Sequence, residues 1–126
     1  MAKNRYKMRV IIAGSRKYTD YEHFLTCLPL IKDKVTSVVC GMAAGADSLG
    51  KRWAEENNIP VDKYPADWDQ YGKSAGYIRN TEMAENADML IAFWNGRVKN
   101  SGTKHMIDIA FKRKLPVMVI LITDEE

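Results

Sequence analysis

The stretch VTSVVCGMAAGADSLGKRWAEENNIP, residues 35–60, decides the fold. It begins with a β-branched apolar run up to Cys40, which predicts a strand. Gly41 ends this run, and residues 44–57 then show the apolar spacing of one helical face, which Pro60 closes. The inward positions of this helix are Leu49, Trp53 and Ala54. A strand, a glycine turn and a helix in this order indicate one βα unit of a parallel sheet.

Similar runs recur along the chain and predict four more strands. Three of them are apolar runs, MRVIIAG at 8–14, which is typical of a strand buried on both faces, DMLIAFW at 88–94 and LPVMVILI at 115–122. The fourth, PVDKYPA at 60–66, is shorter and more polar. Because helical segments separate the strands, we predict an α/β fold, a single Rossmann-like three-layer domain over residues 1–126. Its five-stranded parallel sheet is expected to have the order 3-2-1-4-5.

The remaining helices are predicted from their caps and apolar stripes. Thr19 and Glu22 have the spacing of a capping box, and Pro29 is expected to kink or shorten the helix that follows. The apolar stripe of that helix consists of Tyr21, Phe24, Leu25, Leu28 and Ile31. After the third strand, a loop is expected to lead into a helix that begins near Ser74. A last helix follows the loop 95–101, and its inward positions are Ile107, Ala110 and Phe111.

The composition argues against several functional classes. Nineteen basic and sixteen acidic side chains leave a net charge of +3, and no stretch gathers the positive charge into a stripe, so a nucleic-acid partner is not expected. The apolar runs are strand-sized and the N-terminus lacks a signal-peptide pattern, so we expect a cytoplasmic protein without a membrane partner. Cys27 and Cys40 lack metal-ligand spacing and are expected to be buried reduced thiols. We expect neither metal nor cofactor, and a frayed acidic tail at 124–126.

Three glycine-containing turns follow predicted strands and are expected to form one site. They are GSR at 14–16, GMAAGAD at 41–47 and NSGT at 100–103. In an open parallel sheet, ligands bind beyond the carboxyl ends of the strands, where the strand order reverses. With the order 3-2-1-4-5, the first and third turns flank this point and the second lies beside them. The sequence therefore predicts one crevice.

Each turn leads into the start of a helix, where unpaired N–H groups and the helix dipole favour an anion such as phosphate. We expect Gly41, Gly45 and Gly102 to allow a ligand to approach the backbone closely. Asp47, in the first helical turn, either caps N–H groups or accepts ribose hydroxyls, and the sequence leaves both interpretations open.

Basic and aromatic side chains near these turns supply further candidates. Arg16, Arg79 and Lys104 are candidate positive charges, and the aromatic candidates for stacking on a base are Trp68, Tyr71 and Trp94. The chain contains neither the GxxxxGK[ST] nor the GxGxxG pattern, so a P-loop nucleoside triphosphatase and a dinucleotide fingerprint are not indicated.

The order of these motifs resembles a known family. They are GSR at 14–16, GMAAGAD at 41–47, ADWDQYGKSAGYIRNTEM at 66–83 and FWNG…SGTKHMI over 93–107. Together they are similar to the YspA-type, cpYpsA-related branch of the SLOG superfamily, a Rossmann-like group named after the Smf/DprA and Lonely Guy proteins. The similarity spans nearly the whole chain.

The resemblance implies binding of a nucleotide or nucleotide-derived ligand, either a nucleoside phosphate or an ADP-ribose-like molecule. The expected role is that of a sensor or sequestering module. The ligand-binding candidates on the motifs and turns are Gly14, Ser15, Arg16, Gly41, Gly45, Ala46, Asp47, Arg79, Asn80, Ser101, Gly102 and Thr103. The resemblance also implies a homodimer or higher homo-oligomer, in which the surface from Trp68 to Met83 is either a lid or a subunit contact.

The alternative is an enzyme, a phosphoribohydrolase that cleaves the N-glycosidic bond of a nucleoside monophosphate, as Lonely Guy proteins do. The resemblance places their arginine at Arg79 and their GTxxE glutamate at Met106. Methionine can neither stabilise an oxocarbenium-like centre nor act as a base. If the chain is an enzyme, Glu82 or Asp47 is expected to take the place of that glutamate, with Arg79 on the phosphate.

Overall fold

The computed structural model describes residues 6–123, and the acidic tail expected at 124–126 lies outside them. Within the described residues the strands form one five-stranded sheet, in which every neighbouring pair is parallel. The strands are β1 (Arg9–Gly14), β2 (Ser37–Cys40), β3 (Val61–Lys63), β4 (Met89–Trp94) and β5 (Val117–Leu121). Their order across the sheet is β3-β2-β1-β4-β5, which confirms the predicted order.

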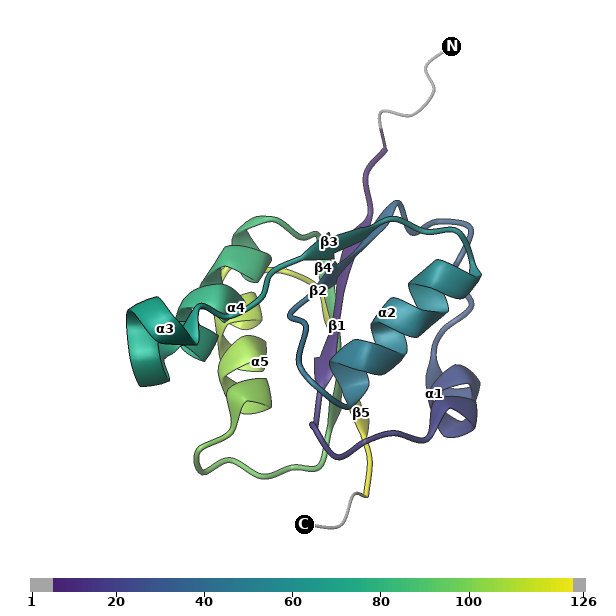
Figure 1. The fold of residues 1–126 in the computed structure, drawn as a ribbon. Helices are drawn as coiled ribbons and strands as arrows, with labels where there is room; N and C mark the ends of the chain where they lie inside the picture. The colour runs from purple at the N-terminus through teal and green to yellow at the C-terminus, as the bar shows by residue number, and fades with distance from the viewer. Residues whose placement is uncertain (1–5, 124–126) are drawn as a thin grey trace.

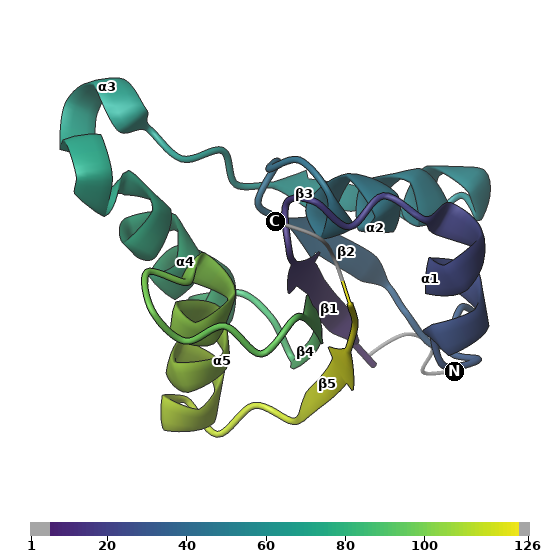
Figure 2. The same ribbon diagram turned by 90° about the horizontal axis from the view of Figure 1, so that it is seen from below.

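Helices cover both faces of this sheet and give the three layers of a Rossmann-like fold (Figure 1). The helices α1 (Tyr21–Cys27) and α2 (Ala46–Glu56) pack on one face, and α4 (Ala75–Glu85) and α5 (Gly102–Lys112) on the other. Between β3 and α4 lie the short helix α3 (Trp68–Tyr71) and a single 3₁₀ turn at Gly72–Ser74. Figure 2 shows α3 standing away from the sheet at the far end of α4. Among the described helices, none is long and apolar enough to cross a lipid bilayer.

Two hydrophobic cores explain why the central strands are continuous apolar runs. Successive side chains of a strand point to opposite faces, and here both faces are covered. Val10 and Ile12 of β1 therefore belong to the core under α1 and α2, whereas Ile11 and Ala13 belong to the core under α4 and α5. The largest side chains in the first core include Phe24, Trp53 and Phe93.

The register of the strands brings the ends of β1, β2 and β4 to one edge of the sheet. Gly14, the last residue of β1, pairs with Phe93 of β4, and Ile11 pairs with Val39 of β2. All three strands run in the same direction, so the loops that follow them meet at the same edge (Figure 2). This edge is the predicted position of the site.

The structure corrects two predictions about α1. The cap is Asp20, whose side chain accepts a hydrogen bond from the His23 N–H at 3.1 Å, and not the predicted Thr19–Glu22 pair. As predicted, Pro29 shortens the helix, which ends at Cys27: a proline disfavours the helical conformation of the residue before it, and Leu28 is already extended. The predicted apolar stripe is the second correction, because Phe24 and Leu28 are buried but Leu25 is exposed.

Three other predictions were wrong in detail. Residues 68–74 are helical and not a loop, because Asp67 caps α3 through the Gln70 N–H at 3.1 Å. Phe111 is exposed, whereas Ile107 and Ala110 are buried as predicted. Cys40 is a buried free thiol, but Cys27 is only partly buried.

The cap of α1 gives a first test. Asp20→Ala should lower the free energy of unfolding by about 1 kcal/mol, because the His23 N–H loses its acceptor. Thr19→Ala is the matched control and should change it by less than about 0.5 kcal/mol, since Thr19 is exposed. Urea unfolding followed by circular dichroism measures both. A loss for Thr19→Ala as large as that for Asp20→Ala would contradict the assignment of the cap.

Candidate functional site

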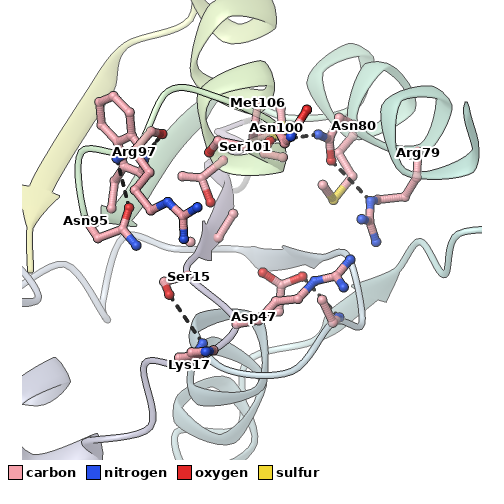
Figure 3. Close-up of a pocket in the computed structure, with 18 of the residues that line it drawn as sticks. Ser15, Lys17, Asp47, Arg79, Asn80, Asn95, Arg97, Asn100, Ser101 and Met106 are labelled. Carbon is pink, nitrogen blue, oxygen red and sulfur yellow. Dashed lines mark hydrogen bonds between the residues drawn. The ribbon is translucent and has the colours of Figure 1, made fainter. Parts of the chain in front are cut away.

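A cleft of about 420 Å³ lies at the carboxyl ends of β1 and β4. Nine of the twelve predicted ligand residues line it, namely Gly14, Ser15, Arg16, Asp47, Arg79, Asn80, Ser101, Gly102 and Thr103. In Figure 3, Ser15, Lys17 and Asp47 lie on one side of the open space, and Asn80, Arg97 and Ser101 lie on the other. The structure therefore brings the three predicted turns together.

The other three predicted residues, Gly41, Gly45 and Ala46, do not line this cleft. Gly45 has a φ of 77°, and a Cβ atom there would collide with the main chain of Ser15 and Arg16. Ala46 is fully buried, and its N–H donates to the Ser15 carbonyl at 3.0 Å. The close approach at Gly45 thus joins the loop after β1 to the start of α2, and it does not leave room for a ligand.

At Gly41 the absent side chain makes room for two others. A Cβ atom there would lie 2.8 Å from Oδ2 of Asp47 and 2.9 Å from Nη1 of Arg79. Arg79 Nη1 also donates a hydrogen bond to the Gly41 carbonyl. Burial lowers the pKa of Arg79, and the nearby Asp47 carboxyl partly offsets this effect. Gly41 therefore allows the guanidinium group to reach from α4 to the end of β2.

Asp47 is a buried carboxyl group on the wall of the cleft. Its side chain is almost completely covered, and Oδ2 accepts a hydrogen bond from the Ala43 N–H at 3.2 Å. Burial raises the pKa of Asp47, while the Ala43 N–H and the charges of Arg79 and Arg16 act in the opposite direction. The sequence left open whether Asp47 caps backbone N–H groups or accepts ribose hydroxyls. In the structure its side chain bonds a backbone N–H, that of Ala43 in the loop before α2.

Asn80 connects α4 to the start of α5. Its Oδ1 accepts from Arg79 Nε at 3.1 Å, and its Nδ2 donates to the Gly102 carbonyl at 3.2 Å. The same Nδ2 lies 3.1 Å from Nδ1 of His105, whose ring stacks on Tyr77. Burial lowers the pKa of His105, so the neutral ring is favoured and Nδ1 is available as an acceptor. Asn80 therefore fixes both Arg79 and the first turn of α5.

The first turn of α5 opens into the cleft. Ser101 caps the helix, with Oγ accepting from the Lys104 N–H at 3.0 Å. The N–H groups of the first helical residues, Gly102 and Thr103, have no acceptor within a helix. A Cβ atom at Gly102 would meet no heavy atom within 4 Å, because this position faces open space. These two N–H groups form a ready site for an anion.

Five basic residues and one acidic residue line the cleft within the described part of the chain. The basic residues are Arg16, Lys17, Arg79, Arg97 and Lys99, and the acidic residue is Asp47. Of these, Lys17, Arg97 and Lys99 were not predicted from the sequence. The loop after β4 is held in place because Trp94 Nε1 donates to the Arg97 carbonyl at 2.9 Å and the Arg97 N–H donates to Asn95 at 2.9 Å.

Several predicted candidates lie elsewhere. Lys104 forms an ion pair with Asp108 on the surface of α5, at 2.7 Å, and is not part of the cleft. Glu82 is exposed and is likewise absent from the lining. Met106, at the position of the glutamate in the GTxxE pattern, is buried and lines the cleft with Met83. Of the aromatic candidates, Trp94 lines this cleft and Tyr71 does not.

Residues 8–71, about half of the chain, match the YspA, cpYpsA-related SLOG family. The chain belongs to this family. Over 122 residues it is 37% identical to the gene 61 protein of Mycobacterium phage D29, a match that covers 87% of this chain and 94% of the phage protein. Membership of the SLOG family suggests a nucleotide-related function.

A solved structure has the same fold. The X-ray structure of DNA processing protein A (DprA) from Streptococcus pneumoniae matches with a TM-score of 0.72 and 15% sequence identity. The match covers 94% of this SLOG chain but only 52% of the DprA chain, so this chain spans about half of that structure. The likeness shows the Rossmann-like fold and confirms the fold class predicted from the sequence.

The two carboxyl groups Asp47 and Asp88 should give opposite pH dependences. The raised pKa of Asp47 means that wild-type stability is lost as the pH rises from 3.8 through the folded-state value. Asp47→Asn should therefore become more stable relative to wild type over this interval. The hydrogen bond from Arg9 lowers the pKa of Asp88, so that its stabilisation is present above pH 3.8 and is lost as the pH falls through the folded-state value.

Asp88→Asn is accordingly the matched control, and it should be less stable than wild type at neutral pH, with the difference vanishing in acid. Thermal unfolding of the three proteins from pH 3 to pH 8 measures these differences. If the stability difference from wild type changes with pH in the same direction for both variants, the burial of a charge at Asp47 is not the dominant effect.

Proposed function

We propose that this SLOG chain binds a nucleoside phosphate or an ADP-ribose-like ligand, and that it senses or sequesters this ligand. A phosphoryl group of the ligand lies at the first turn of α5. The observation that carries the proposal is that Gly102 and Thr103, the first two residues of α5, line a cleft together with five basic residues.

The charge of the cleft fits a phosphate ester. A phosphate monoester carries a charge of roughly −1.5 to −2 at neutral pH. The start of a helix and nearby guanidinium and ammonium groups both stabilise such an anion, and their effect is stronger in a cleft than on an open surface. Arg79 is held by Asn80 and the Gly41 carbonyl, so little side-chain entropy is lost when it contacts the ligand.

The nucleoside part has a partner in Asp47. An ionised carboxylate offers about four acceptor positions, and within residues 6–123 the hydrogen bond from the Ala43 N–H occupies one of them, on Oδ2. The remaining capacity suits ribose hydroxyl groups. In this proposal Asp47 takes both roles that the sequence left open, because one oxygen bonds the backbone while the carboxylate still faces the cleft.

A thermal-shift screen tests the proposal. Inorganic phosphate, ribose 5-phosphate, adenosine and the nucleotides AMP, GMP, CMP, UMP and ADP-ribose form the panel, with matched NaCl as the control for ionic strength. A ligand at a hundred times its dissociation constant should add about 2.7 kcal/mol of stability. Phosphorylated nucleosides should stabilise the protein while adenosine does not. Stabilisation by none of these compounds would overturn the proposal.

Gly102→Val gives a sharper test of where the phosphate lies. The new side chain occupies the open space of the cleft, so nucleotide affinity should fall at least tenfold, which is about 1.4 kcal/mol. Stability should hardly change, because valine is no worse than glycine in a helix. Lys104→Val is the matched control, since it adds the same side chain outside the cleft. Calorimetric titration measures the affinity of both variants. A folded Gly102→Val protein that binds the nucleotide with unchanged affinity would contradict the proposed phosphate position.

Phosphoribohydrolase activity is the second candidate function, and the raised pKa of Asp47 favours it. A buried carboxyl group of raised pKa is suited to protonating a leaving base. Incubation with nucleoside monophosphates and chromatography of the products distinguishes the two functions. If the chain is an enzyme, free base is released, and Asp47→Asn abolishes this release while the exposed Glu82→Gln does not. Absence of any release would contradict the phosphoribohydrolase alternative.

A further inference from the structure

A second cavity of about 330 Å³ adjoins the cleft and has no role in the proposal above. The two share Arg16, Ala43 and Arg79, so these residues lie where one space meets the other. The shared position of the two arginines means that a ligand held at the start of α5 can extend past them. Apart from the two arginines, the second cavity is lined by apolar residues and glycine, among them Met42, Pro65 and Trp68.

Trp68 is placed on this cavity by the short helix α3, which the sequence did not predict. Asp67 caps α3 through the Gln70 N–H, and this fixes Trp68 as the first helical residue. A Cβ atom at Gly76 of α4 would lie 3.4 Å from Cη2 of Trp68 and 3.7 Å from Nη2 of Arg79. The indole ring thus lies against α4 beside the guanidinium group of Arg79. Half of the Trp68 surface is nevertheless exposed.

Met42 is the second unusual residue of this cavity. Its φ of 63° lies in the left-handed region, which a non-glycine residue rarely adopts. Its N–H donates to Sγ of Cys40 at 3.3 Å, and its side chain remains exposed. Strained backbone of this kind concentrates at ligand sites. A methionine thioether makes favourable contacts with aromatic rings.

We infer that the second cavity binds the base of the nucleotide, which stacks on Trp68, while Arg16 and Arg79 contact the ribose and phosphate between the two spaces. This inference rests on the proposed function and adds a ligand class to it. The ligand is a nucleotide with an intact aromatic base, and a sugar phosphate is bound only weakly. Stacking on an aromatic side chain tolerates different bases, because every base has a π-face.

The test compares ligands with and without a base. AMP, GMP, CMP, UMP and ribose 5-phosphate are titrated into wild-type protein and into Trp68→Ala, Trp68→Phe and Tyr71→Ala. At least one nucleotide should bind about 10- to 100-fold more tightly than ribose 5-phosphate, in line with the loss measured when a stacking aromatic is replaced. Trp68→Ala should remove this advantage and leave the affinity for ribose 5-phosphate unchanged.

The other variants show whether the effect is specific. Trp68→Phe keeps an aromatic ring and should restore most of the advantage. Tyr71→Ala removes an exposed aromatic residue of the same helix that lines neither cavity, so it should have no effect. Nucleotides that bind no more tightly than ribose 5-phosphate, or a Trp68→Ala protein that retains the advantage, would overturn the inference and leave the proposed function standing. If neither class of ligand binds, both fail.

Discussion

At Gly41 the absence of a side chain lets a carboxyl group and a guanidinium group occupy one space. Asp47 comes from the start of α2 and Arg79 from α4, on opposite faces of the sheet, and both reach the end of β2. Burying either charge alone is costly, but each offsets part of the cost for the other. The two faces of the fold are therefore joined at the position where a ligand would bind, and any side chain at Gly41 would separate them.

From this point the contacts lead to the first turn of α5. Arg79 bonds to Asn80, and Asn80 bonds to the carbonyl of Gly102, so the position of the helix start depends on α4. Arg79 also lies between the cleft and the second cavity. Arg79 therefore contributes to both proposed sites, because it supports the start of α5 through Asn80 and lines both spaces.

The sheet was predictable because strands buried on both faces leave unmistakable apolar runs, such as those ending at Gly14 and Cys40. The turns were predictable because glycines punctuate these runs. The helix α3, which begins at Trp68, was not predicted, since a four-residue helix has too few turns to show a periodic pattern. Arg97 and Lys99 were missed because a loop has no period at all, and the error at Lys104 reflects an i,i+4 pair with Asp108 that competes for its charge.

The most direct measurement is a ¹H–¹⁵N correlation spectrum of the uniformly labelled protein during titration with AMP and with ribose 5-phosphate. A phosphoryl group at the start of α5 should give the largest and saturable shifts at the amides of Gly102 and Thr103 with AMP, and shifts at the same amides at higher concentrations of ribose 5-phosphate. Amides of Gly102 and Thr103 that stay in place while others saturate would show that the phosphate is bound elsewhere on the protein.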